Sequence, residues 1–316
     1  MTKWNAMLKK RMLPVVVLAV IALALPFLLE SEYLLHLAIL ILLWTALGAS
    51  WNLLGGYTGQ VSFGHSAFFG MGAYVSLLLH TKMGVSLWMG LLYAGISASL
   101  IAIPIGWICF RLRGPYFSLS VLAFSEVLRL IVLHWKEVTE GAVGILLIQS
   151  IVESKTSFYY LMLAVTAIIL LVVSYVIKRK LGFYFIAIRD DEEAAESLGI
   201  YTTRYKLYSL IISAFFTGVM GSLFANYTSY IDPYIVFHIG DIAIAMVLVV
   251  ILGGIGTFWG PLVGAICVVL VNEGSRLMFA NASVLIYGAL VVLVILFLPK
   301  GIVGSLKQHT SKWFHA

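Results

Sequence analysis

The sequence predicts an all-α polytopic membrane protein, and three observations support this prediction. Hydrophobic residues make up 62% of the 316 residues and charged residues only 11%, whereas about 25% of the residues of a typical soluble domain are charged. The apolar residues form long segments that match the roughly 20 residues a helix needs to cross about 30 Å of hydrocarbon. The charged residues concentrate in residues 178–206, which hold 11 of the 34 charged side chains (20 basic and 14 acidic).

We expect a single transmembrane domain, residues 1–316, with about ten transmembrane helices. The first apolar segment follows Lys9, Lys10 and Arg11 and is long for the apolar region of a signal peptide, so we interpret it as an uncleaved first helix. The segments expected to cross the membrane are 12–29, 34–54, 62–80, 86–109, 115–134, 158–177, 206–228, 239–253, 258–276 and 283–299.

The basic residues orient these segments, because cytoplasmic loops of membrane proteins are enriched in Lys and Arg. With both termini cytoplasmic, fifteen Lys and Arg residues lie on the cytoplasmic side, four lie outside, and Arg129 lies in a span. We therefore predict cytoplasmic termini and a cytoplasmic position for residues 178–206. We therefore interpret the basic net charge of +6 as a signal of topology rather than of nucleic acid binding, and the sequence contains no recognisable nucleic acid-binding module.

Six glycines occur between residues 55 and 72, around the start of the third predicted span. At membrane depth such glycines permit close backbone approach or a broken helix, which is tolerated only against protein or a cavity. Gly59 is therefore a candidate for packing or for lining a permeation path. His65 fits a proton relay or, as we favour, a neutral imidazole that hydrogen-bonds at a helix start.

Glu126 and Arg129 are predicted to share one face of the fifth span, because residues three apart on a helix are neighbours. Opposite charges at this spacing neutralise each other, which suits a site within the membrane. The pair could fix helix packing or line the permeation path, and the sequence favours neither role over the other.

The loop at 135–157 is long enough to hold a short surface helix over residues 143–152. Such a helix would be either a docking surface for a binding protein or a simple connector.

The centre of the charged segment predicts one short helix outside the membrane. Asp190 can cap its start, with Glu193 three residues later, and Gly199 stands where a helix commonly ends. A helix of about two turns is not stable alone in water, so it must pack against a partner, and adjacent alanines leave little bulk in between. The residues assigned to this helix and its ends are Asp190, Asp191, Glu192, Glu193, Ala194, Ala195, Leu198 and Gly199.

A second glycine-rich stretch, residues 253–264, joins the eighth and ninth predicted spans. The dipeptide Gly260-Pro261 cannot continue a helix smoothly, so the chain must turn there. Gly254 and Gly256 are candidates for close packing or for lining the path. LGGIGT at 252–257 is similar to LGGYTG at 54–59, but our topology places both on the same side, so the match does not indicate an inverted repeat.

The sequence contains no glycine-rich loop of the form GxxxxGK[ST], so we expect nucleotide to bind to a separate subunit. It also contains no GxSxG, HExxH or CxxC motif, and the two cysteines, Cys109 and Cys267, lie in apolar runs. We therefore expect no enzyme activity, no metal site and no cofactor bound by this chain.

Four stretches resemble one family of transport proteins. They are GYTGQVSFGHSAFFGMGAY, AIRDDEEAAESLGI, GGIGTFWGPLVGA and LPKGIVG, and together they spread over most of the chain. On these motifs the chain resembles the LivM-type permeases of branched-chain amino acid ABC importers. The resemblance implies that the helix at 191–198 is a coupling helix, which seats in a groove on a cytoplasmic ATPase.

The resemblance also implies a multi-pass protein of the bacterial cytoplasmic (inner) membrane with several partners. These are a second homologous, LivH-like permease, two cytoplasmic ABC ATPases that bind ATP, and a periplasmic substrate-binding protein. The expected substrate is a branched-chain or other hydrophobic amino acid, and similar permeases carry urea or aromatic compounds.

Two other classes of function fit the same spans. A secondary transporter or a channel would also contain glycine-broken helices and an intramembrane charge pair, but it would not need a docking helix. A purely structural membrane protein would support no flux. Dependence of uptake on ATP distinguishes these classes from an ATP-driven importer.

Overall fold

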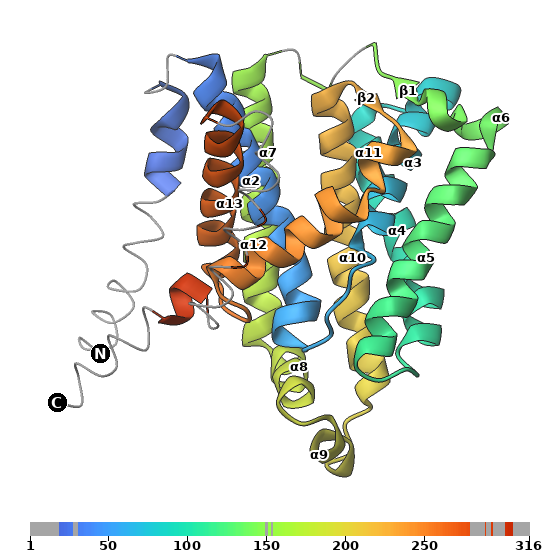
Figure 1. The fold of residues 1–316 in the computed structure, drawn as a ribbon, viewed down its shortest axis with the longest axis vertical. Coiled ribbons are helices and arrows are strands. Elements are labelled where there is room, and N and C mark those ends of the chain that lie inside the picture. The colour runs from blue at the N-terminus through green and yellow to red at the C-terminus, as the bar shows by residue number, and fades with distance from the viewer. Residues whose placement is uncertain are drawn as a thin grey trace.

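The computed structural model describes residues 19–27, 31–148, 151, 152, 154–278, 288, 292 and 301–305. These residues form an almost entirely helical bundle (Figure 1). Six of the described helices are long and apolar enough to cross a membrane. The chain is therefore an all-α membrane protein, as the sequence predicts.

The elements follow one another as a series of long helices with short helical and strand segments between them. In chain order they are α2 (Glu32–Asn52), the π-helix η1 (Leu53–Tyr57), α3 (His65–Met83), α4 (Leu87–Cys109), α5 (Pro115–His134), α6 (Lys136–Thr139), the 3-10 helix η2 (Gly141–Val143), β1 (Ile145–Leu146), α7 (Lys155–Lys178), α8 (Lys180–Asp190), α9 (Glu192–Ser197), α10 (Thr202–Thr228), β2 (Tyr230–Ile231), α11 (Pro233–Val236), the π-helix η3 (Ile239–Ile244), α12 (Ala245–Gly253) and α13 (Gly260–Met278).

The observed helices agree with most of the predicted spans. Six predicted spans each overlap one of the six apolar helices, namely 34–54, 86–109, 115–134, 158–177, 206–228 and 239–253. The spans predicted at 62–80 and 258–276 correspond to α3 and α13, which are 19 residues long but are not among the six. Half of the span predicted at 12–29 is described, and these residues, 19–27, are helical. The span predicted at 283–299 lies almost entirely outside the described residues.

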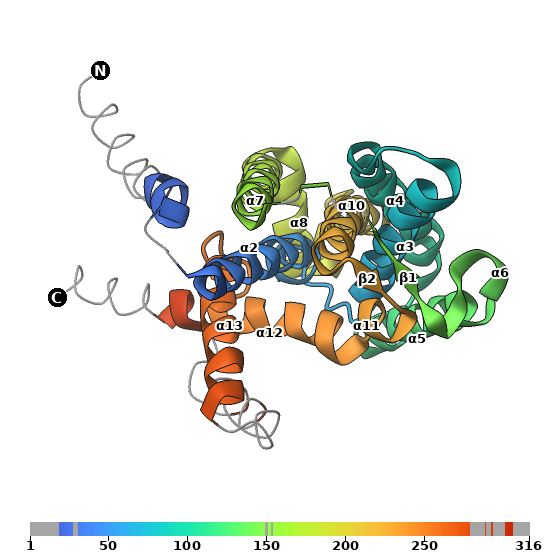
Figure 2. The ribbon, with the colours of Figure 1, turned by 90° about the horizontal axis from the view of Figure 1, so that it is seen from above.

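Helix α10 lies near the middle of the bundle, where it packs against α2, α3 and α4 (Figure 2). Glycines bring these backbones together. An ideal Cβ on Gly72 of α3 would lie 2.1 Å from the carbonyl oxygen of Gly218 in α10, and one on Gly218 would lie 2.5 Å from that of Ala94 in α4. Small residues at helix contacts are the usual way in which membrane helices approach closely.

Buried hydroxyl groups connect the same helices. Ser222 in α10 donates a hydrogen bond to Ser76 in α3 at 2.6 Å, and Ser213 donates to the carbonyl oxygen of Ser50 in α2 at 2.6 Å. Other large apolar side chains are exposed on the outer surface, as expected for helices in lipid. On α4 the exposed large apolar residues form a stripe at helical spacing, Trp88, Leu92, Ile96, Leu100, Ile103 and Trp107.

The segment after α5 differs from the predicted helix at 143–152, which is wrong for residues 144–148. Residues Ile145 and Leu146 instead form β1, which pairs antiparallel with β2. Gly144 has a φ of +77°, and an ideal Cβ there would lie 2.3 Å from the carbonyl oxygen of Ile231. The positive φ and this close approach favour the strand pair over a helix. The two strands lie at the opposite end of the bundle from α9 (Figure 1).

We expect Gly72→Ala to destabilise the protein and Gly274→Ala to leave its stability unchanged or slightly raised. The added methyl group of Gly72→Ala would force α3 and α10 apart, and overpacking of this kind costs about 1–3 kcal/mol. Gly274 lies in α13, where no described atom is within 4 Å of the ideal Cβ, and alanine has the higher helix propensity. Thermal unfolding in detergent measures both effects, and equal melting temperatures for the two variants would contradict this packing.

Candidate functional site

The predicted short helix in the charged segment is present as α9, at one end of the bundle (Figure 1). Asp191 caps it, because its carboxylate accepts a hydrogen bond from the backbone N–H of Ala194 at 3.0 Å. The prediction that Asp190 is the cap is wrong. Asp190 is the last residue of α8 and pairs with Arg189 at 2.8 Å, whereas Asp191 has the extended backbone that an N-cap requires.

The end of α9 lies where the sequence predicts it. Gly199 has a φ of +83°, which is a conformation that glycine adopts without a Cβ penalty. The backbone N–H of Ile200 donates to the carbonyl oxygen of Ala195 at 3.1 Å, and that of Gly199 donates to the carbonyl oxygen of Glu196 at 2.9 Å. The helix therefore ends in a Schellman motif.

The two adjacent alanines of α9 have different surroundings. Ala195 is 2% exposed and packs within this chain, where α9 contacts α8 and α10. Ala194 is exposed, and Leu198 at the carboxyl end of α9 is 81% exposed. The surface that an external partner can contact therefore contains Ala194 and Leu198, and the expectation that Ala195 faces a partner is corrected.

Side-chain contacts fasten α9 to α10. The Lys206 ammonium lies 2.6 Å from the Glu192 carboxylate, and the Lys206 side chain is only 3% exposed. The hydroxyl of Thr202 donates to Glu196 at 2.6 Å. Because Thr202 and Lys206 lie in the first turns of α10, displacement of α9 acts directly on that helix.

The two glycine-rich stretches meet at the end of the bundle from which α8 extends. The Asn52 side chain bridges them, since its Nδ2 donates to the carbonyl oxygen of Thr257 at 3.0 Å and its Oδ1 accepts from the backbone N–H of Gly256 at 2.9 Å. An ideal Cβ on Gly56 would lie 2.7 Å from the backbone nitrogen of Gly256. The prediction that LGGYTG and LGGIGT lie on the same side is therefore confirmed.

Arg189 brings the charged segment to this glycine junction. An ideal Cβ on Gly59 would lie 2.9 Å from Cγ of Arg189, and one on Gly256 would lie 3.0 Å from its Nη1. Gly59, Gly254 and Gly256 all have a positive φ, of 76°, 129° and 67°. Sequence reasoning missed Asn52 and Arg189, and the repeated LGG motifs were the signal that could have identified the contact.

His65 begins α3 and is fully buried. Its Nε2 lies 2.8 Å from the hydroxyl of Ser213 and its Nδ1 lies 3.1 Å from that of Ser62. Because the Ser213 proton goes to the carbonyl oxygen of Ser50, the Ser213 oxygen accepts from Nε2–H, and Nδ1 accepts from Ser62. A neutral imidazole satisfies this arrangement, which favours a structural role for His65.

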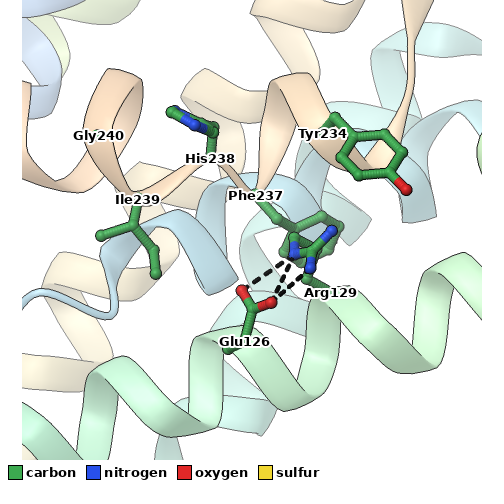
Figure 3. A pocket seen from close by; sticks show the side chains of 7 residues that line it. All are labelled: Glu126, Arg129, Tyr234, Phe237, His238, Ile239 and Gly240. Carbon is green, nitrogen blue, oxygen red and sulfur yellow. Dashed lines mark hydrogen bonds and ion pairs between the residues drawn. The ribbon is translucent and has the colours of Figure 1, made fainter.

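Glu126 and Arg129 pair on α5 and line a cavity of about 320 Å³ between α5 and the α11–η3 segment (Figure 3). The Nε of Arg129 donates to both carboxylate oxygens of Glu126 at 3.0 Å, and a terminal nitrogen makes a further contact. The guanidinium carbon lies 5.3 Å from the centre of the Tyr234 ring. The predicted pair is therefore formed, and it faces a cavity.

Comparisons with known proteins identify one family. The model of the family described as branched-chain amino acid transport system / permease component matches residues 33–296. The chain is 31% identical to the high-affinity branched-chain amino acid transport system permease protein LivM of Escherichia coli (strain K12), over 93% of this chain and 75% of that protein. It is 27% identical to LivH of Salmonella typhimurium, over 82% of this chain and 92% of that protein.

Among solved structures, the fold is similar to that of PsaBC from Streptococcus pneumoniae in complex with Fab. The TM-score is 0.48 and the sequence identity is 13%, over 89% of this chain and 97% of that chain.

We expect Glu192→Ala to loosen α9 and Glu193→Ala to leave it in place. Removing Glu192 leaves the buried Lys206 ammonium without its partner, and breaking a buried pair costs about 3–5 kcal/mol. Because the Glu192 side chain is 29% exposed, solvent screens part of the interaction, and we expect Glu192→Ala to destabilise the attachment of α9 by about 2 kcal/mol. The control variant removes the ion pair between Glu193 and Arg113, in which both side chains are well exposed. Such a pair contributes less than about 1 kcal/mol to stability. Hydrogen–deuterium exchange over residues 192–200 measures the difference, and equal exchange in both variants would show that Lys206 does not hold α9.

Proposed function

Because this chain belongs to the family of branched-chain amino acid transport permeases, we propose that it is the permease subunit of an ATP-driven importer that moves branched-chain and other hydrophobic amino acids into the cell. It is a multi-pass protein of the bacterial inner membrane, and the family consists of transport components rather than enzymes. The proposed substrate is supported by its relatives LivM and LivH, which are permease proteins of high-affinity branched-chain amino acid transport systems.

The attachment of α9 to α10 supports the proposed coupling to ATP hydrolysis. α9 extends beyond the bundle, exposes Leu198 and is fastened to α10 through the Glu192–Lys206 pair. A short helix with one exposed apolar side chain suits insertion into a groove of a cytoplasmic ATPase. When the ATPases close, they push on α9, and α10 carries the displacement to α2, α3 and α4, against which it packs.

The partners follow from the composition of the family and from what this chain lacks. LivM and LivH are both similar to this chain, so the permease pairs with a second, homologous LivH-like subunit. No nucleotide-binding loop of the P-loop type occurs in the sequence, so two separate ABC ATPases bind ATP, and no cofactor binds to this chain. A periplasmic binding protein delivers the amino acid.

The proposed topology is a single transmembrane domain of ten helices with both termini in the cytoplasm. It rests on the excess of Lys and Arg in the segments that this topology places inside. Residues 178–206, which contain α9, are then cytoplasmic, where they can reach an ATPase.

Uptake measurements in proteoliposomes test the function. The chain is reconstituted with the partner permease, the ATPases and the binding protein, and uptake of radiolabelled L-leucine is measured with and without ATP. We expect uptake only with ATP. Uptake without ATP would indicate a secondary transporter or a channel, and ATP-driven uptake of urea or an aromatic compound in place of leucine would change the proposed substrate.

We expect Leu198→Arg to lower ATP-dependent leucine uptake about 10-fold, because a charged side chain cannot replace a buried apolar contact at the centre of an interface. The conservative variant Leu198→Met should retain uptake. Expression and melting temperature of the permease should stay unchanged in both variants, since Leu198 is exposed in the isolated chain. Normal uptake by Leu198→Arg would contradict a docking role for α9, whereas Ala195→Arg would be a poor test because Ala195 is buried within the permease itself.

We expect a cysteine at Ser197 to react with a membrane-impermeant maleimide only from the cytoplasmic side, and a cysteine at Val143 only from the outside. Both side chains are exposed. Ser197 belongs to α9, and Val143 belongs to η2 between α6 and β1, and these elements lie at opposite ends of the bundle (Figure 1). Labelling of intact cells and of inverted vesicles measures the two reactions. Reaction of the Ser197→Cys variant in intact cells would reverse the proposed orientation.

A further inference from the structure

The cavity beside α5 has the dimensions and the mixed lining of a small-molecule site. Its volume of about 320 Å³ is at the lower end of the roughly 300–1,000 Å³ that ligand pockets occupy. Glu126 and Arg129 line one side, and the α11–η3 segment lines the other with Tyr234, Phe237 and Ile239 (Figure 3).

The two charged groups remain accessible although they lie within a membrane-crossing helix. The Glu126 side chain is 39% exposed and the Arg129 side chain 17% exposed in this chain. A carboxylate at this depth does not face lipid, because ionisable groups within a membrane face protein or a water-filled cavity. The ion pair itself is contained within α5, and the guanidinium of Arg129 lies over the ring of Tyr234 in α11 on the other side of the cavity.

The charge of the pair matches a zwitterion. A carboxylate and a guanidinium side by side sum to zero, so a ligand with a single net charge would leave one charge unbalanced in a medium that penalises it. An amino acid carries an ammonium group next to a carboxylate, which can face Glu126 and Arg129 respectively. Arg129 is suited to this role because its five N–H donors form a planar fork that recognises carboxylates.

The opposite side of the cavity contains Tyr234 and His238 together with an apolar part, Phe237 and Ile239. Phe237 is fully buried and packs on Gly70 of α3, where an ideal Cβ would lie 2.6 Å from its ring. Its ring centre is 6.0 Å from that of Tyr74. Ile239 begins the π-helix η3, and π-helical turns occur frequently at functional sites. This side can accommodate an aliphatic or aromatic side chain.

A second cavity lies along α5, on the side toward α9. It has a volume of about 460 Å³ and is lined by Gly59, Phe63 and Ser118, among others, and by Glu192 of α9. Since α5 begins at Pro115 and ends at His134, this cavity lies at the end of α5 near α9, and the Glu126–Arg129 cavity lies in the half farther from α9.

We propose that Glu126 and Arg129 form a subsite for the ammonium and carboxylate groups of the transported amino acid, on a path that α5 lines. This inference rests on the proposed function. The pair acts as a receiving site for the zwitterionic end, and Phe237 and Ile239 contact the side chain. Selection at this site is for an amino acid of moderate size with an apolar side chain.

The test measures how many molecules of radiolabelled L-leucine enter proteoliposomes per ATP hydrolysed by the complete reconstituted complex. We expect Glu126→Gln and Arg129→Gln each to lower this ratio about 10-fold, since each removes one charge-assisted hydrogen bond to the substrate. The matched controls Glu273→Gln and Arg276→Gln remove the same kind of i,i+3 pair from α13 and should leave the ratio unchanged.

Two further variants separate a substrate site from a structural pair. Exchange of the charges in Glu126→Arg/Arg129→Glu should leave the ratio low, because the substrate would have to bind in reverse, whereas full recovery would show that only the pairing matters and would overturn the inference. Ile239→Trp narrows the cavity without altering the pair and should also lower the ratio. An unchanged ratio in Ile239→Trp, or in both neutral variants, overturns the inference.

The subsite and the proposed function fail in different ways. If the unmodified complex takes up no leucine with ATP, the proposed function fails. If it transports leucine with ATP while the neutral variants of Glu126 and Arg129 keep the original ratio, only the subsite fails.

Discussion

The ion pair between Lys206 and Glu192 is the interaction on which the proposed mechanism depends. It joins α9, which extends from the bundle, to α10, the longest helix described. The Lys206 ammonium is buried, and a buried charge is stable only when it is paired. The fold therefore keeps α9 in a fixed position on α10, so that a force on one displaces the other.

From α10 the contacts continue without interruption to the cavity on α5. Gly218 packs against Gly72 of α3, and the same helix supplies Gly70, against which Phe237 packs. Phe237 lines the cavity that contains Glu126 and Arg129. A second set of contacts connects α8 to the junction of the two glycine-rich stretches, where Arg189 contacts Gly59 and Gly256. Closely packed backbones have little room to deform, so these contacts favour movement of the elements as units.

Periodicity and composition were sufficient to predict the long helices, because their lengths are set by the thickness of the membrane. The same reasoning placed a short helix before Gly199 but assigned its cap to Asp190 instead of Asp191. Two adjacent aspartates offer the same side-chain oxygen, and only the extended backbone of Asp191 decides between them. The strand pair of β1 and β2 could not be predicted, since each strand has two residues and its partner is far away in the sequence. The bridging role of Asn52 was likewise hidden, because its partners at Gly256 and Thr257 come from another part of the chain.

A self-neutralising charge pair suits a site that must release what it binds. When the cavity is empty, the carboxylate of Glu126 and the guanidinium of Arg129 satisfy each other within one helix, so neither charge is left unpaired. An arriving zwitterion exchanges these contacts for its own, and the net gain is small because one set of charge-assisted hydrogen bonds replaces another. Permeation requires binding that is favourable enough for entry yet weak enough for exit. Two unlike charges on separate helices would satisfy the first condition but would hold the substrate more tightly, because each would be left unpaired when the substrate departs.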